Sequence, residues 1–117
     1  MTASRAMALL RIYTDEAARA GGRPLYESLV LQARDSGLAG ATVLRGPMGF
    51  GLSHRLHTAK ILDLSGNLPL VIEIVDAEPA LRAFAAAISP IGDIGLVTLE
   101  RVEVLHGVRP APGRESA

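Results

Sequence analysis

The feature that most constrains the fold is a strand-like segment, residues 69–75, that is apolar on both of its sides. Its sequence is Pro-Leu-Val-Ile-Glu-Ile-Val, which is rich in the β-branched residues that favour strands. Successive side chains of a strand point to opposite faces. Three aliphatic side chains therefore share one face, and Glu73 alone interrupts an otherwise apolar second face. A sheet built around this strand needs cover on both sides, because apolar surface left in water is unfavourable.

The rest of the chain alternates between strand and helix signals. Three more segments have the composition of strands: residues 7–13, 41–45 and 96–105. Two segments have helical spacing and typical helix ends: Pro24 to Gly37, and an Asp76 N-cap to Ser89-Pro90. The order strand, helix, strand, strand, helix, strand predicts an α+β, ferredoxin-like βαββαβ fold, a four-stranded antiparallel sheet with two helices on one face.

The last predicted strand carries one irregularity. Its apolar positions change phase between Leu99 and Val102, and an extra residue in one strand produces such a change. A β-bulge is therefore expected near Glu100-Arg101.

The face of the sheet without helices predicts an assembly. It would leave aliphatic side chains in water, and an apolar patch of that kind usually marks an interface. We therefore expect a homo-oligomer that buries this face. Arg11 and Glu73 would lie on it in neighbouring strands, which favours an ion pair between them over a catalytic role for Glu73.

Composition limits the function classes. The 117 residues suit one domain and include no cysteine, which excludes disulfides, thiolate metal sites and a cysteine nucleophile. Zero net charge and four aromatic rings give no support for nucleic-acid binding. No apolar run reaches the roughly 18 residues of a membrane span, and residues 1–6 do not resemble a signal peptide. We expect a cytoplasmic protein without membrane insertion, with residues 1–6 as an extension and residues 107–117 as a disordered tail.

A glycine-rich basic segment, residues 45–60, interrupts the apolar pattern and contains no carboxylate. It belongs to a long loop predicted over residues 46–67, in which residues 58–64 allow either a short helix or more loop. Glycines and cations on a long connector suit an anion or partner site. A guanidinium can bind phosphate in a bidentate way, which favours Arg45, at a strand end, over Arg55. The alternative is a solvated loop whose charges only keep it soluble.

Two histidines of this loop are candidate metal ligands. His54 and His57 are three residues apart and would share a face of a helical turn, and imidazoles bind zinc or copper. A third ligand is missing nearby, so plain exposure is the simpler interpretation. No Ser-His-Asp arrangement, paired-carboxylate motif or intact phosphate-binding loop is present, so we predict no catalytic residues and no enzyme.

With these segments in place, the chain resembles the PII-like signalling proteins, in particular the branch known only as a domain of unknown function. The resemblance covers about residues 7–106 and is carried by four stretches: residues 10–13, 24–27, 38–46 with Gly49-Phe50-Gly51, and 68–76. It implies a ferredoxin-like protomer in a compact homotrimer. It also implies adenine nucleotides bound between subunits by the base of the 46–67 loop and the 91–95 turn, and a loop that contacts a partner such as a membrane transporter.

The chain departs from the PII pattern at two places. Leu52-Ser53 stands where PII proteins have Arg-Gln, and residues 87–99 contain no basic side chain, so an anion there would be held by backbone N–H groups.

The resemblance and the loop pattern together give a candidate effector site, in which Phe50 is expected to anchor the loop by packing. Its members are Arg45, Gly46, Gly49, Phe50, Gly51, Arg55, Lys60, Gly92 and Asp93. The predicted function is a trimeric PII-like regulator that binds a small anionic effector between subunits. The alternatives are a metal-ion tolerance protein of similar trimeric fold that uses His54 and His57, and a small enzyme in the intersubunit cleft.

Overall fold

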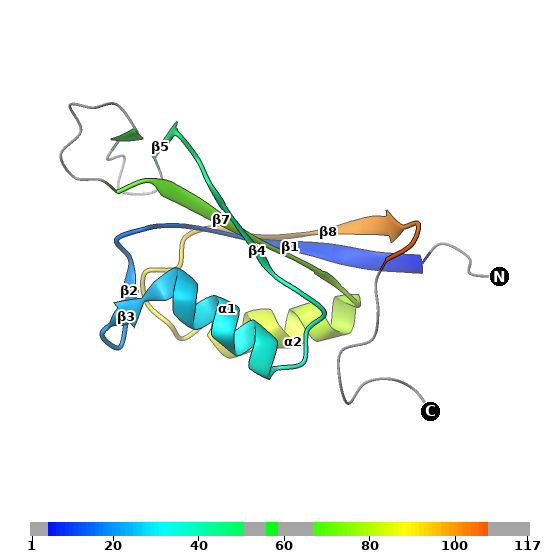
Figure 1. The fold of residues 1–117 in the computed structure, drawn as a ribbon. Helices are drawn as coiled ribbons and strands as arrows, with labels where there is room; N and C mark the ends of the chain where they lie inside the picture. The colour runs from blue at the N-terminus through cyan, green and yellow to red at the C-terminus, as the bar shows by residue number, and fades with distance from the viewer. Residues whose placement is uncertain (1–4, 51–55, 59–66, 108–117) are drawn as a thin grey trace.

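A four-stranded antiparallel sheet with two helices on one face forms the body of the protein (Figure 1). The computed structural model describes residues 5–50, 56–58 and 67–107. The elements are β1 (Arg5–Asp15), β2 (Arg19–Ala20), β3 (Arg23–Pro24), α1 (Leu25–Asp35), β4 (Thr42–Arg45), β5 (Met48–Gly49), β6 (His57–Thr58), β7 (Pro69–Asp76), α2 (Glu78–Ile88) and β8 (Val97–Val104). The strand order β4-β7-β1-β8 confirms the predicted ferredoxin-like α+β fold.

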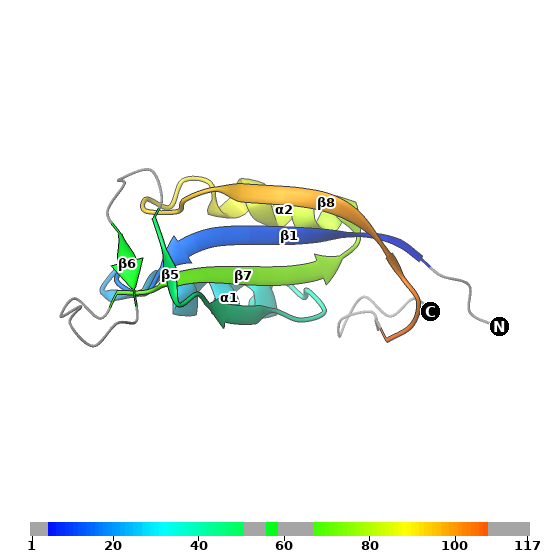
Figure 2. The same cartoon turned by 90° about the horizontal axis from the view of Figure 1, so that it is seen from above.

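The core lies between the helices and one face of the sheet. β7 alternates strictly between buried and half-buried positions, and its buried aliphatic side chains face those of β1, such as Ile72 opposite Ile12. Both helices bury a single stripe against this layer, made of Leu25, Leu29 and Ala33 in α1 and Leu81, Phe84 and Ile88 in α2. Among the described residues, no helix lies on the opposite face of the sheet (Figure 2).

The predicted bulge in the last strand is wrong. β1 and β8 pair without a skipped residue, from Arg5 opposite Val104 to Ile12 opposite Val97. The apolar phase changes because Arg101 takes a position on the helix-covered face, opposite Ala8. Its guanidinium Nε donates to Glu78 Oε1 of α2 at 3.0 Å. A long side chain can cover apolar surface with its stem while its charged head finds a partner at the edge.

Two short ribbons were not predicted. β2 and β3 form a hairpin whose turn residues, Gly21 and Gly22, have φ angles of 57° and 79°. This left-handed backbone strains other residues and is the one that the tightest hairpin turns require. The second ribbon, β5 with β6, lies at the base of the 46–67 loop.

The helix ends lie close to the predicted positions. Pro24 precedes α1 as its N-cap and not as its first helical residue, and Gly37, at φ 82°, follows the last turn as expected. Asp76 stands one residue before the N-cap of α2, Ala77. The residue is 1% exposed, and its two carboxylate oxygens accept hydrogen bonds from Ala77 N (2.7 Å) and Ala39 N (2.9 Å). It therefore ties the connection after α1 to the start of α2.

We expect Asp76→Ala to lower the free energy of unfolding by about 3 kcal/mol, because two backbone donors lose a charged acceptor. Asp76→Asn keeps one carbonyl acceptor and should lose clearly less. Urea unfolding at a fixed protomer concentration measures both. Equal stability of the two variants would contradict this role of the carboxylate.

A second polar contact joins α2 to β8. Glu78 accepts hydrogen bonds from Arg82 Nε at 2.8 Å and from Arg101 Nε at 3.0 Å. The bond from Arg82, and then that from Arg101, lowers the pKa of Glu78 below its ordinary value of 4.5. A lowered pKa in the folded state means that the ionised carboxylate stabilises the fold above the unfolded-state pKa. This contribution is lost as the pH falls through the folded-state pKa.

The stability difference between the parent chain and Glu78→Gln should therefore stay constant from neutral pH down to about 5 and shrink at lower pH. Chemical unfolding at a series of pH values measures it. Glu27→Gln, which changes an exposed glutamate in the first turn of α1, controls for the helix dipole. A difference for Glu78→Gln that persists unchanged at pH 3 would show that the ionised contact does not contribute.

Candidate functional site

The connector between β4 and β7 begins and ends at one place. Gly46 N donates to Pro69 O at 2.8 Å, directly after the last β4–β7 pair, Arg45 opposite Leu70. Two residues further on, β5 pairs antiparallel with β6. The predicted loop therefore starts as a paired ribbon that projects from the end of the sheet (Figure 1).

Two of the candidate glycines have a packing role at this base. A Cβ at Gly46 would lie 3.1 Å from Pro69 Cγ, and one at Gly49 would lie 3.3 Å from the same atom. Contacts that short are tighter than those of most real side chains, so glycine lets the ribbon approach Pro69. The amide of Gly46 donates to Pro69 O, and an anion would have to compete for it.

Glu16 holds both ends of the connector, and the sequence did not single it out. Its Oε2 lies 2.9 Å from Arg45 Nη2, at the first end. Its Oε1 accepts a hydrogen bond from Leu68 N at 3.1 Å, at the second end. The backbone of Glu16 also donates to Leu68 O at 3.0 Å. The only signal in the sequence is an acidic residue just after a strand, and no spacing relates it to Arg45 or Leu68.

Arg45 lies where it was predicted, at the end of β4. Its side chain is 63% exposed, so its guanidinium is accessible to a solute. Glu16 engages one nitrogen of the guanidinium. An arginine has five N–H donors in all, so others remain for a further acceptor. The arginine that was predicted to bind an anion is thus accessible, and it already has a carboxylate partner in this chain.

The turn between α2 and β8 holds the second half of the candidate site. Asp93 has φ 67°, a left-handed conformation that aspartate tolerates, and Gly92 is exposed with open space around it. The glycine that the fold requires is Gly95. Its N donates to Tyr13 O at 3.1 Å, and a Cβ there would lie 2.5 Å from the same oxygen.

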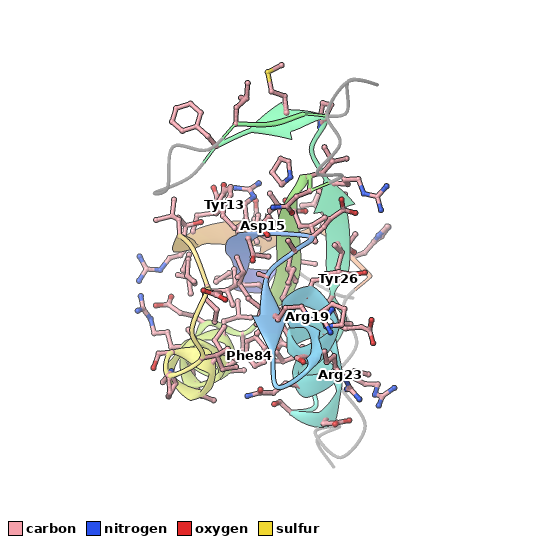
Figure 3. All side chains as sticks on the ribbon, turned by 90° about the vertical axis from the view of Figure 1, so that its left-hand side faces the viewer. Tyr13, Asp15, Arg19, Arg23, Tyr26 and Phe84 are labelled. Carbon is pink, nitrogen blue, oxygen red and sulfur yellow. The ribbon has the colours of Figure 1, made fainter. Side chains whose placement is uncertain are left out.

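The two halves of the candidate site lie at one end of the sheet but at its opposite edges. Arg45 belongs to the edge strand β4, next to Leu70 of β7. The 91–95 turn joins the other side of β1 through the contacts of Tyr13 with Gly95 and Leu96. Three strand spacings separate these edges, roughly 14 Å. Figure 3 looks at this end of the molecule, with Tyr13 and Asp15 labelled at the end of β1.

Exposed apolar side chains lie on and beside the ribbon. Phe50 is 64% exposed, Leu56 57% and Met48 51%. Phe50 was expected to anchor the loop by packing, but only a minor part of its surface is packed against the rest of the protein. These side chains make the described part of the segment apolar at its surface, whereas the sequence had emphasised its cations.

Four predicted site residues lie outside the described part of the chain: Gly51, His54, Arg55 and Lys60. His57 is described only as part of strand β6. Among the described residues, no group of three or more histidine, aspartate or glutamate side chains could hold a metal ion.

A hollow of about 210 Å³ lies between the end of α1 and α2. It is lined by Ser36, Leu38, Ala80, Ala83, Phe84 and Ala87. None of these side chains is charged, so the hollow is not suited to an anion.

The helix-free face of the sheet has a charged centre and an apolar surround. Arg11 Nε donates to Glu73 Oε2 at 2.9 Å, which confirms the predicted pair, and its Nη1 donates to Glu100 Oε1 at 2.5 Å. The hydrogen bond to Glu73, aided by the charge of Glu100, raises the pKa of Arg11 above its ordinary value. Around the cluster, the pairing registers place Met7, Leu9, Tyr13, Leu44, Val71, Val75 and Val102 on the same face.

Among the described residues, no helix is both long enough and apolar enough to cross a membrane.

Comparisons with known proteins bear on the family and the fold. The chain is 40% identical over 98 residues to a UPF0166 protein of Aquifex aeolicus, covering 84% of this chain and 92% of that protein. It is 31% identical over 100 residues to a UPF0166 protein of Methanocaldococcus jannaschii, with 85% and 92% coverage. Among solved structures it resembles CPII of Thiomonas intermedia K12, determined with bound ADP and bicarbonate. The TM-score is 0.63 and the identity 17%, over 88% of this chain and 92% of that one.

The similarity to CPII is one of fold, since the sequence identity is low, and it agrees with the PII-like architecture expected from the sequence. A family model for DUF190, described as "Uncharacterized ACR, COG1993", matches residues 7–104. The chain therefore belongs to the DUF190 family and has a PII-like, ferredoxin-like fold.

Proposed function

We propose that this chain is the protomer of a homotrimeric PII-like regulator. In this proposal a small anionic effector, such as an adenine nucleotide, binds between subunits, and residues 46–67 contact a partner protein. The observation that carries the proposal is the position of the two half-sites at opposite edges of one sheet, beside a helix-free face that is largely apolar.

The helix-free face supports the assembly. Its aliphatic side chains come from three adjacent strands, β4, β7 and β1, and from β8 at the edge. A continuous apolar surface of this kind favours burial against another protein surface. Each charged group of the Arg11 cluster at its centre has a partner within one protomer. One arginine against two glutamates leaves a net charge of −1, which a covering surface would have to meet with a cation or a polar group. Further copies of the chain are the simplest cover, and the PII resemblance favours three.

The effector site follows from the assembly. Within one protomer Arg45 and the 91–95 turn are about three strand spacings apart, and each lies at an edge that a neighbouring copy can approach. A site between copies would combine the exposed guanidinium of one edge with the backbone N–H groups of the other. Gly46, Gly49, Phe50, Gly92 and Asp93 would line it, and the predicted contribution of Gly51, Arg55 and Lys60 belongs to the same proposal. The ADP-bound state of CPII makes an adenine nucleotide the first effector to test.

The projecting ribbon suits a protein partner. Aromatic side chains and methionine are enriched at interfaces, and the exposed Phe50 and Met48 provide them here, with the exposed Leu56 beside them. A membrane transporter is the partner that the PII resemblance favours. The role inferred is regulatory and not catalytic, in which effector binding shifts the population of partner-competent conformations.

The assembly can be tested on the helix-free face. The parent chain should have a mass of about 37 kDa in solution, three times the 12.3 kDa of one chain. Val75→Glu should shift the mass toward one chain, because it would bury an unpaired charge in each interface. Size-exclusion chromatography with light scattering measures this. Ala83→Glu, on the exposed side of α2, should leave the mass unchanged, and a monomeric parent at micromolar concentration would refute the assembly.

The effector can be tested by calorimetry with AMP, ADP and ATP at low salt. We expect binding of at least one of them, and Arg45→Ala should weaken it about ten-fold or more, because a charged hydrogen-bonding partner of the phosphate is lost. Arg34→Ala removes an exposed arginine of α1 and should have little effect. The absence of binding by all three nucleotides at millimolar concentration would reject the nucleotide version. An unchanged affinity of Arg45→Ala would remove Arg45 from the site.

A further inference from the structure

We propose that Glu16 is an internal competitor for the effector. In the free chain its carboxylate occupies one nitrogen of the Arg45 guanidinium, and an anion that binds the guanidinium through this nitrogen must displace it. Displacement would release one of the ties between the two ends of the 46–67 connector. This inference rests on the proposed function insofar as Arg45 is an effector contact, but the tie itself can be tested without any ligand.

One carboxylate makes both contacts, and this couples them. Oε2 of Glu16 faces Arg45 Nη2 at 2.9 Å, and Oε1 accepts from Leu68 N at 3.1 Å. The two oxygens belong to one rigid group. A rotation that withdraws Oε2 from the guanidinium therefore also moves Oε1 relative to the Leu68 amide.

The exposures of the two partners show which of them an anion would reach. The Arg45 side chain is 63% exposed, whereas that of Glu16 is only 23% exposed. A dissolved anion can approach the guanidinium from solvent, and the group it would meet there is the Glu16 carboxylate. A half-buried carboxylate that has lost its cation is better solvated when it turns outward, which would leave the Leu68 amide without this acceptor.

The strengths of the contacts make the exchange feasible. An ion pair this exposed shifts an equilibrium by only about two- to five-fold. A phosphate that binds a guanidinium through two N–H groups forms a stronger, charge-assisted contact. An effector can therefore displace Glu16, and the displacement lowers the affinity of the effector by only a few-fold.

Displacement should loosen the connector locally and not separate its ends. The bond from Gly46 N to Pro69 O and the pairing of β5 with β6 do not involve Glu16. The Leu68 amide should therefore respond to the loss of the Glu16–Arg45 contact, while the Gly46 amide should not.

The first experiment uses the full chain without ligand and measures amide hydrogen exchange by NMR. Arg45→Gln should speed exchange at Leu68 about two- to five-fold and leave Gly46 unchanged. In a Glu16→Gln background the same Arg45→Gln change should have no further effect on Leu68, since the coupling carboxylate is already gone. An unchanged Leu68 amide in Arg45→Gln, or an equal effect in both backgrounds, would overturn the tie.

The second experiment measures ADP affinity by calorimetry. Glu16→Gln should bind ADP about two- to five-fold more tightly than the parent chain, because the competitor has lost its charge. Asp15→Asn is the matched control. It removes the same charge one residue away and keeps an oxygen for the Ala17 and Ala18 amides that Asp15 serves, so it reports the general effect of a lost negative charge.

Tighter binding by Glu16→Gln than by Asp15→Asn supports local competition, and equal or weaker binding overturns it. If the parent chain binds AMP or ATP but not ADP, that nucleotide replaces ADP in this experiment. If it binds none of the three, the nucleotide proposal fails, and competition for a nucleotide fails with it, while the exchange experiment still decides the tie. Circular dichroism of each variant confirms the fold, and Arg45→Lys replaces Arg45→Gln in the first experiment if the latter does not fold.

Discussion

The rest of the structure depends on β7, a strand that is apolar on both faces. One face places Leu70, Ile72 and Ile74 in the core beneath the two helices. The other adds Val71 and Val75 to the helix-free face, where water is a poor environment for them. The described part of the chain builds two helices, which cover one side of the sheet. The protomer is thus complete as a fold but has a surface that suits association, and the proposed assembly follows from this single constraint.

Polar contacts fix the geometry at the two ends of the sheet. At one end, buried Asp76 ties the connection after α1 to the start of α2, and the arginines around Glu78 join α2 to β8. At the other end, Glu16 and the Gly46–Pro69 contact gather both ends of the long connector. At the first end, a buried carboxylate holds two segments of the backbone together. The second is more exposed and holds its cation by a weak ion pair, which is the kind of contact that a ligand can replace.

Much of the fold could be predicted because its signals are local. β-branched runs gave the strands, helical spacing gave the two buried stripes, and Gly37 and Ser89-Pro90 marked the helix ends. Arg11 and Glu73 could be paired because alternation along two strands places them on one face. The bulge prediction failed because Arg101 occupies an inward position through a contact with Glu78, and a phase count along one strand cannot detect a partner on a helix.

For the candidate site, the sequence by itself determined that a basic, glycine-bearing connector follows an arginine at a strand end, and that the sheet has a second apolar face. The tertiary structure alone decided that Glu16 pairs with Arg45 and that the 91–95 turn lies across the sheet from Arg45. It also showed that Gly46 and Gly49 pack closely against Pro69, which leaves little room for a side chain at either position. Residue type and periodicity are properties of neighbours along the chain, and they therefore survive in the sequence. Which carboxylate meets which guanidinium depends on strand order and register, which exist only after β1, β4 and β7 have come together.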